Sequence, residues 1–182
     1  MKRLMPLLLA LVVAFGAACS FANDALPSGP ALGQTAPEFR LQDQKGDWHT
    51  LEGEQGKWLV LYFYPKDFTP GCTTEVCAYR DDIVALRKAG ADVLGVSLDD
   101  VKSHAEFAEK YHVPFRLLSD ADGKVAKAYG VYVKRGPMEY ARRETFLIDP
   151  QGKVAKRYTD VDPEQNSKQV LADLDGLKQA AH

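Results

Sequence analysis

The chain has 182 residues, and its 23 Lys and Arg residues against 25 Asp and Glu residues give a formal net charge of -2. The basic residues are scattered along the chain instead of forming a cluster, so we expect no nucleic-acid partner. Four histidines and three cysteines are too few and too dispersed for a zinc site or a disulfide-stapled scaffold, and we expect no metal and no cofactor.

The amino-terminal segment has the features of an export signal. Lys2 and Arg3 form a short basic start, and residues 4–14 form an apolar run that is too short to span a membrane comfortably. Small residues follow this run. We therefore predict a signal peptide over residues 1–22 that is cleaved before Asn23.

Cleavage at this point leaves residues 23–182 as one periplasmic domain, whose length is ordinary for a single domain with a full core. A second processing route stays open. Residues 16–19 (GAAC) resemble a lipoprotein box in which Cys19 becomes acylated and anchors the protein, although glycine stands where leucine is usual. Both routes export the chain, and neither leaves a membrane-spanning segment.

The first predicted elements are an extended lead-in, a hairpin and a buried strand. Residues 23–36 are rich in Pro and Gly, which favours an extended lead-in. Residues 39–41 and 48–51 flank a turn-forming stretch, residues 43–47, and this pattern predicts a short β-hairpin. Residues 58–63 (WLVLYF) are apolar, β-branched or aromatic, which indicates a buried strand.

The residues after this strand are typical of a helix start that carries a reactive cysteine. Thr69 is a good N-cap, and Pro70 suits the first helical position, where its missing N–H has no cost. Cys72 is then the third helical residue. Its sulfur lies over N–H groups that have no partner within the helix, at the positive end of the helix dipole. Both effects stabilise a thiolate, so we predict that Cys72 is a nucleophile.

A second cysteine, Cys77, lies five residues further along the same helix. In a continuous α-helix the Cα atoms of such a pair are about 8.7 Å apart, whereas a disulfide needs Cα atoms closer than about 7 Å. A bond between Cys72 and Cys77 therefore requires the first turn to unwind, as for an attacking thiol with a resolving thiol. The alternative is a permanent structural disulfide, but such a bridge gains little from closing so short a loop.

The rest of the chain alternates predicted strands with predicted helices. The apolar spacing extends the cysteine helix to Arg87, with Gly90 ending it. The elements after it are a strand over residues 93–98, a helix that Ser103 caps and Pro114 stops, a strand over 115–118, a helix over 125–129, a hairpin with strands 145–149 and 154–158, and a helix over 163–179. This order predicts an α/β fold, a three-layer sandwich around a central mixed sheet.

Several segments of this chain resemble those of the peroxiredoxins. Pro65, Thr69 and Cys72 form a Pro-x-x-x-Thr-x-x-Cys pattern after a predicted strand. The chain is similar in particular to the peroxiredoxin Q type, also called bacterioferritin comigratory protein. The resemblance covers essentially the whole predicted domain, and the segments that carry it are 36–39 (APEF), 60–67 (VLYFYPKD), 69–73 (TPGCT), 118–120 (LSD), 122–124 (DGK) and 143–149 (RETFLID).

The resemblance implies a thioredoxin-like fold and a thiol peroxidase that reduces hydrogen peroxide and organic hydroperoxides. It implies that Cys72 is the peroxidatic cysteine, which becomes a sulfenic acid. Cys77 is then the resolving cysteine, and it forms an intramolecular disulfide with Cys72. Because the resolving thiol belongs to the same chain, we expect a monomer.

The same resemblance implies the residues of the peroxide site. Thr69 and Arg143 match the side chains that orient and polarise the peroxide, with Gly71 as a further substrate-binding residue. Pro65 matches the residue that shields the pocket. The chemistry agrees with these roles, because Arg143 would stabilise both a thiolate and the charge that develops on the departing oxygen.

Two features depart from the peroxiredoxin Q pattern. Phe68 stands where a polar residue such as Asn is common, which favours organic hydroperoxides. The export signal is unusual for a group whose members are mostly intracellular and draw electrons from thioredoxin. The expected reductant is therefore a thioredoxin-like protein or another dithiol.

Two other functions compete with the peroxidase. A thioredoxin-like disulfide exchanger of exported proteins is the main alternative, but the redox pair is not Cys-x-x-Cys. A metallochaperone or binding protein on the same fold needs a histidine downstream of the cysteine pair, and after His112 the next histidine is His182 at the end of the chain.

Overall fold

The computed structural model describes residues 28–180 of the chain. The predicted signal peptide over residues 1–22, its cleavage site and Cys19 lie outside the described residues. Within residues 28–180, no helix is both long enough and apolar enough to cross a membrane.

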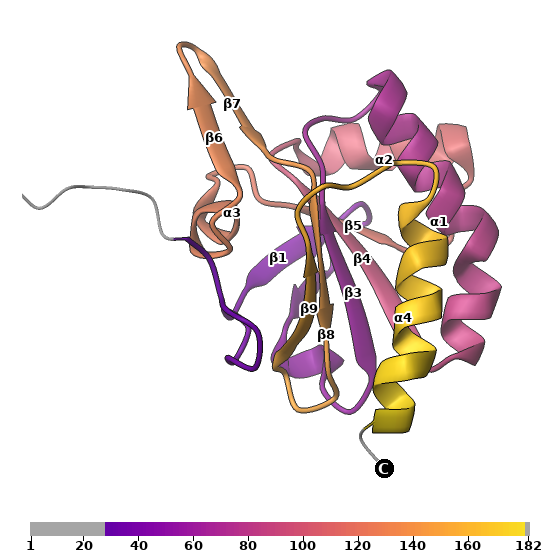
Figure 1. The fold of residues 1–182 in the computed structure, drawn as a ribbon. Coiled ribbons are helices and arrows are strands. Elements are labelled where there is room, and N and C mark those ends of the chain that lie inside the picture. The colour runs from indigo at the N-terminus through magenta and orange to yellow at the C-terminus, as the bar shows by residue number, and fades with distance from the viewer. Residues whose placement is uncertain (1–27, 181–182) are drawn as a thin grey trace, which may run out of the picture.

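A seven-stranded sheet forms the centre of the molecule, with the strand order β2-β1-β5-β4-β3-β8-β9 (Figure 1). The β3–β4 and β4–β5 pairs are parallel and the other pairs are antiparallel, so the predicted mixed sheet is confirmed. Its strands are β1 (Arg40–Asp43), β2 (Trp48–Thr50), β3 (Trp58–Phe63), β4 (Ala91–Ser97), β5 (Arg116–Ser119), β8 (Glu144–Ile148) and β9 (Val154–Tyr158).

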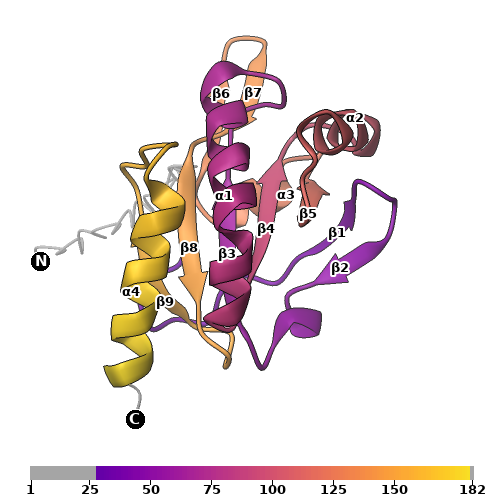
Figure 2. The ribbon, with the colours of Figure 1, turned by 90° about the vertical axis from the view of Figure 1, so that its right-hand side faces the viewer.

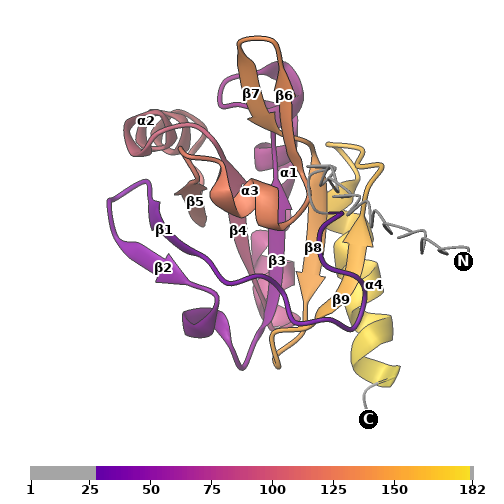
Figure 3. The same ribbon diagram turned by 90° about the vertical axis from the view of Figure 1, so that its left-hand side faces the viewer.

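Helices cover both faces of this sheet. Figure 2 shows α1 and α4 in front of one face, and Figure 3 shows α3 in front of the opposite face. The helices are α1 (Pro70–Lys88), α2 (Val101–Tyr111), α3 (Lys124–Ala128) and α4 (Asn166–Ala180), with a short 3-10 turn, η1 (Glu52–Glu54). The three-layer α/β sandwich predicted from the element order is therefore confirmed.

The side chains of β3 explain why the strand has no polar alternation. Leu59, Leu61 and Phe63 pack in a core that includes residues of α3. Val60 and Tyr62 point the other way, into a core shared with α1, α2 and α4. A strand that is buried on both faces needs apolar residues at every position. The sequence WLVLYF meets this requirement.

Three local predictions need correction. The N-cap of α2 is Asp100, whose Oδ1 accepts the backbone N–H of Ser103 at 2.8 Å, so Ser103 lies inside the first turn. Asp is as good a cap as Ser, and the helix begins earlier because Asp100 provides this bond. The last helix begins at Asn166 and not at residue 163. Before it, the backbone carbonyl of Asp162 accepts the N–H groups of Gln165 and Asn166 in a turn that leads into the helix.

The third correction is a second, two-stranded sheet that the sequence did not predict. It consists of β6 (Tyr132–Arg135) and β7 (Met138–Ala141), joined at Gly136, which has a φ of 58°. In Figure 1 this hairpin projects from the body of the molecule. Its second strand leads directly to Arg143, so the hairpin belongs to the connection that delivers this side chain to the site.

Candidate active site

The start of α1 forms as the sequence predicts. Thr69 occupies the N-cap position with extended backbone angles, Pro70 is the first helical residue, and the helix continues without a break to Lys88. Cys72 is therefore the third helical residue. One detail was wrong: the Thr69 side chain does not cap the helix, because its hydroxyl donates to the carbonyl of Lys66 at 2.9 Å.

Cys72 is buried against a cation from a distant part of the chain. Its side chain is 2% exposed, and its Sγ accepts a hydrogen bond from Arg143 Nη2 at 3.2 Å. Arg143 directly precedes β8, whose Glu144 lies opposite Phe63 at the end of β3. Since β3 leads into the loop before α1, the pairing of β3 with β8 carries Arg143 to the first turn of the helix.

Glu75 is a further member of this site that the sequence analysis missed. It lies one turn after Cys72, is 0% exposed and accepts a hydrogen bond from Arg143 Nη1. The sequence pattern could have identified it, because Glu75 lies beside Val76 on a helix face that is otherwise apolar. A carboxyl group on such a face needs a buried cation as its partner.

Burial and charge set the ionisation of this pair. Burial raises the pKa of the Glu75 carboxyl from 4.5 to about 7, although Arg143 acts in the opposite direction. Burial by itself would lower the pKa of the Arg143 guanidinium, but Glu75 and Cys72 outweigh it and the pKa is raised. Arg143 therefore stays a cation, whose Nη1 donates to the Glu75 carboxyl group and whose Nη2 donates to the Cys72 sulfur.

The other predicted site residues surround this centre. A Cβ atom built on Gly71 would lie 3.2 Å from Arg143 Nη2, so the absence of a side chain at Gly71 lets the guanidinium approach the helix. Pro65 and Thr69 are half-buried in the loop between β3 and α1. Phe68, in the same loop, is 42% exposed and packs edge-on against Phe107 of α2 with ring centroids 5.1 Å apart.

Cys77 has different surroundings from Cys72. Both thiols are free, and α1 is continuous between them. Cys77 is half-buried and packs against the core that α1, α2 and α4 share. It also lines a surface depression of about 300 Å³ together with Thr74, Ala78, Asp81, Asp82, Glu164 and Lys168. The two thiols therefore lie in separate environments, one enclosed and one open to solvent.

The histidines play no part in a metal centre within the described segment. Among residues 28–180, no group of three or more His, Cys, Asp or Glu side chains is arranged to hold a metal ion. His49 and His104 each contact an aspartate instead, at 2.9 Å. The chemistry at α1 therefore rests on a thiol, a guanidinium and a carboxyl group.

Comparison with known proteins connects this arrangement with one family. The AhpC/TSA family model matches residues 32–157. A chloroplastic peroxiredoxin Q from Sedum lineare is 43% identical over 151 residues, which cover 80% of this chain and 78% of that protein.

Solved structures agree with this match. A mutant of Xylella fastidiosa PrxQ superposes with a TM-score of 0.78 at 33% identity, covering 84% of this chain and 99% of that chain. An intermediate or ligand complex of the Xanthomonas campestris bacterioferritin comigratory protein, studied for its alkyl peroxide reduction activity, superposes with a TM-score of 0.72. The identity is 38%, over 76% of this chain and 91% of that chain.

Proposed function

Because this chain belongs to the AhpC/TSA family and, within it, to the peroxiredoxin Q and bacterioferritin comigratory protein group, we propose that it reduces hydroperoxides through Cys72 with Cys77 as the resolving thiol. Members of this group are thiol peroxidases of the thioredoxin-dependent type, and this protein is one of them. The observation that supports the roles of its residues is the 3.2 Å contact between Arg143 Nη2 and Cys72 Sγ.

In the first half-reaction the Cys72 thiolate attacks the terminal oxygen of the hydroperoxide. The S–O bond forms as the O–O bond breaks, and the departing oxygen takes a proton and leaves as an alcohol, or as water from hydrogen peroxide. Cys72 is oxidised to a sulfenic acid and the peroxide is reduced. Arg143 stabilises the thiolate and the negative charge on the departing oxygen, and the free N–H groups of the first turn add to this effect.

In the second half-reaction the Cys77 thiolate attacks the sulfur of the Cys72 sulfenic acid. The S–S bond forms, and the hydroxyl group leaves with a proton as water. The first turns of α1 unwind for this step, because a continuous helix holds the two Cα atoms about 8.7 Å apart. A thioredoxin-like protein or another dithiol then reduces the disulfide by exchange. No second copy of the chain is required, so the working unit is a monomer.

The loop before α1 bears on the choice of peroxide. Phe68 presents a partly exposed aromatic ring two residues from Pro70 and next to Thr69. An apolar ring at this position favours the alkyl portion of an organic hydroperoxide over water. We therefore include organic hydroperoxides among the substrates, in line with the alkyl peroxide activity of the Xanthomonas campestris relative.

A reductant screen on residues 23–182 tests this function. Consumption of hydrogen peroxide and of cumene hydroperoxide is measured with dithiothreitol, thioredoxin and glutaredoxin as electron donors, and Cys72→Ser is the control. We expect turnover with at least one donor and none in the variant. A protein that leaves both peroxides intact while its Cys72 is alkylatable contradicts the proposal. Reduction of insulin without peroxide consumption supports the disulfide exchanger instead.

We also propose that the chain is exported to the periplasm by its amino-terminal segment. The basic start and the apolar run over residues 4–14 support this proposal. Amino-terminal sequencing of the protein from fractionated cells tests it, and Asn23 is the expected first residue. A lipid on Cys19 supports the lipoprotein route, whereas an uncleaved chain in the cytosol contradicts both routes.

A further inference from the structure

A buried polar network lies beneath the loop that joins β3 to α1. Its centre is Asp67, whose side chain is almost completely buried. Oδ1 of Asp67 accepts the hydroxyl of Tyr64 at 2.8 Å, and Oδ2 accepts the hydroxyl of Ser103 at 2.7 Å. Oδ2 also lies 2.9 Å from Nδ1 of His104, and the backbone N–H of Asp67 donates to Asp99 at 2.9 Å.

The geometry assigns the proton of this His–Asp contact. His104 is 0% exposed, and within residues 28–180 its Nε2 has no hydrogen-bond partner. A proton on Nδ1 lets the ring donate to the Asp67 carboxylate, which then accepts three donors. A proton on Nε2 would leave a buried N–H without an acceptor and would place two acceptors against each other at Nδ1, which is unfavourable. His104 therefore donates through Nδ1.

This donor holds a loop with a constrained backbone. Asp67 lies midway between Pro65 and Thr69, and the next residue, Phe68, has a φ of 61°. A residue other than glycine adopts this left-handed conformation only when its surroundings impose it. The contacts that impose it come from α2, through His104 and Ser103 on Asp67 and through Phe107 on the Phe68 ring.

We propose that His104 and Asp67 are positioning residues for the peroxidase reaction. The hydrogen bond from His104 Nδ1 locks the conformation of the loop that contains Pro65 and leads through Thr69 into the first turn of α1, where Cys72 lies. The proposal rests on the proposed function, because it concerns the reaction of Cys72 with peroxide. His104 lies outside the motif Pro-x-x-x-Thr-x-x-Cys, and it acts from a different helix.

Two substitutions of His104 separate the role of its two nitrogens. The amide nitrogen of Asn matches the place of Nδ1, and that of Gln matches the place of Nε2. His104→Asn therefore keeps the donor to Asp67, whereas His104→Gln moves it to the side that has no partner. Both variants are made in a Cys77→Ser background, so that Cys72 is the one thiol of residues 23–182.

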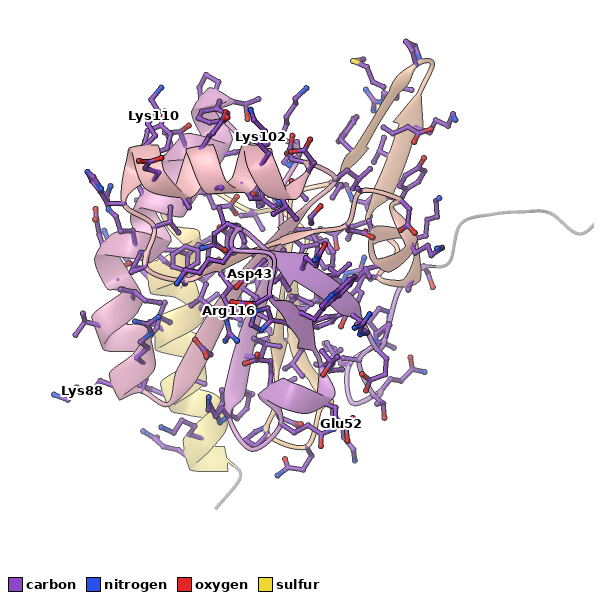
Figure 4. All side chains as sticks on the ribbon, turned by 180° about the vertical axis from the view of Figure 1, so that it is seen from behind. Asp43, Glu52, Lys88, Lys102, Lys110 and Arg116 are labelled. Carbon is purple, nitrogen blue, oxygen red and sulfur yellow. The ribbon has the colours of Figure 1, made fainter. Side chains whose placement is uncertain are left out.

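The chain offers a matched control in a second His–Asp contact. His49 Nε2 lies 2.9 Å from Asp43 Oδ2, the same length as the His104 contact, and both side chains are largely buried. Asp43 belongs to β1, which β5 and β4 separate from β3, and it lies near Arg116 at the back of the molecule (Figure 4). His49→Asn removes the Nε2 donor of this contact, since the amide of Asn matches Nδ1, and it does so in a part of the sheet away from Cys72.

The experiment compares two rates at Cys72. The single-turnover rate with hydrogen peroxide depends on the loop, whereas the rate of alkylation by iodoacetamide depends on the thiolate and its access. We expect His104→Gln to slow the peroxide reaction about 10- to 100-fold, as when a reacting group is misplaced by about 1 Å. The alkylation rate should stay within about twofold of the parent's rate. His104→Asn should regain most of the peroxide rate, and His49→Asn should keep all of it.

Three results would overturn the proposal: a peroxide rate unchanged in His104→Gln, equal losses of both rates, or equal rates in His104→Asn and His104→Gln. If His104→Gln does not fold, Ser103→Ala removes another donor to Asp67 and should show the same split with a smaller loss. If the parent itself does not react with peroxide, the proposed function has failed. Amide exchange over residues 65–69 then decides the positioning role, and it should be faster in His104→Gln than in His49→Asn.

Discussion

Cys72 and Cys77 lie five residues apart on one helix and border the same core, but their polar surroundings differ. Cys72 is 2% exposed and contacts a guanidinium at 3.2 Å, in the first turn where the backbone N–H groups are free. Cys77 is half-buried beside a depression that several carboxylates line, a full turn further from the helix start. The same residue type on the same helix therefore has two chemistries, and the tertiary neighbours make the difference.

The carboxyl group of Glu75 sharpens this contrast. It shares Arg143 with Cys72, and burial keeps its pKa near 7. When Glu75 is protonated, the charge of Arg143 acts mainly on the sulfur. Cys77 lies outside this arrangement. The comparison predicts that substitutions in the first turn affect the reaction with peroxide, whereas substitutions at Cys77 affect the resolution of the sulfenic acid.

Substitution of the cysteines by serine should have the largest effect on the reaction with peroxide. Cys72→Ser should abolish peroxide consumption, because the nucleophile is lost. Cys77→Ser should still consume one equivalent of peroxide per chain and then accumulate the sulfenic acid or a mixed disulfide. Stopped-flow peroxide consumption and mass spectrometry of the product measure both outcomes. Turnover in Cys72→Ser would show that the assignment of the two thiols is wrong.

Loss of the cation at Cys72 is the next effect in size. Arg143→Gln should slow the reaction with peroxide about 100- to 1,000-fold, since one preorganised donor to a developing charge contributes this much in comparable sites. Arg142→Gln is the matched control, because the Arg142 side chain binds Glu144 and the carbonyl of Gly130 and not the sulfur. Equal losses in the two variants would contradict a specific role for Arg143.

Glu75 should make the free energy of unfolding of the protein depend on pH. A carboxyl group whose pKa is raised by folding, here from 4.5 to about 7, stabilises the fold below pH 4.5 and loses this contribution as the pH rises to 7. Urea unfolding of the wild type and Glu75→Gln measures it. The free energy of unfolding of the wild type, relative to Glu75→Gln, should fall by up to about 3 kcal/mol across this range. A difference that is independent of pH would exclude the raised pKa.

Oxidation should remove the contrast between the two cysteines by joining them. After peroxide treatment, the tryptic peptide Asp67–Arg80 should contain an internal disulfide. Amide exchange over residues 69–80 should become about tenfold faster or more, because the helical hydrogen bonds of α1 are lost there. The strands of the central sheet provide the internal control, because their amide exchange should not change. An oxidised protein with this disulfide and unchanged protection would refute the unwinding.

Phe68 should have the smallest effect, on the choice of substrate. Phe68→Asn should lower the ratio of the cumene hydroperoxide rate to the hydrogen peroxide rate about two- to fivefold, because a partly exposed ring contributes about 0.5–1 kcal/mol of apolar contact. Both rates are measured on the same preparation. Val84→Asn is a control for an exposed apolar side chain on α1, and it should leave the ratio unchanged.

The sequence by itself determined the parts that depend on neighbours in the chain. The start of α1 follows from Thr69, Pro70 and Cys72, and β3 follows from an unbroken apolar run. The spacing of the two cysteines already excluded a disulfide in an intact helix. The same local rules missed β6 and β7, because their charged sequence and exposed faces carry no apolar alternation.

Only the tertiary structure decided which side chains meet. Arg143 reaches Cys72 across 71 positions through the pairing of β3 with β8, and His104 reaches Asp67 across 37 through the packing of α2. A glutamate is expected at the surface from its residue type, but Glu75 is buried in the folded protein. Residue type and local spacing determine backbone conformation, whereas burial and charge pairing depend on contacts between distant segments, and these contacts exist only once the sheet and helices have packed.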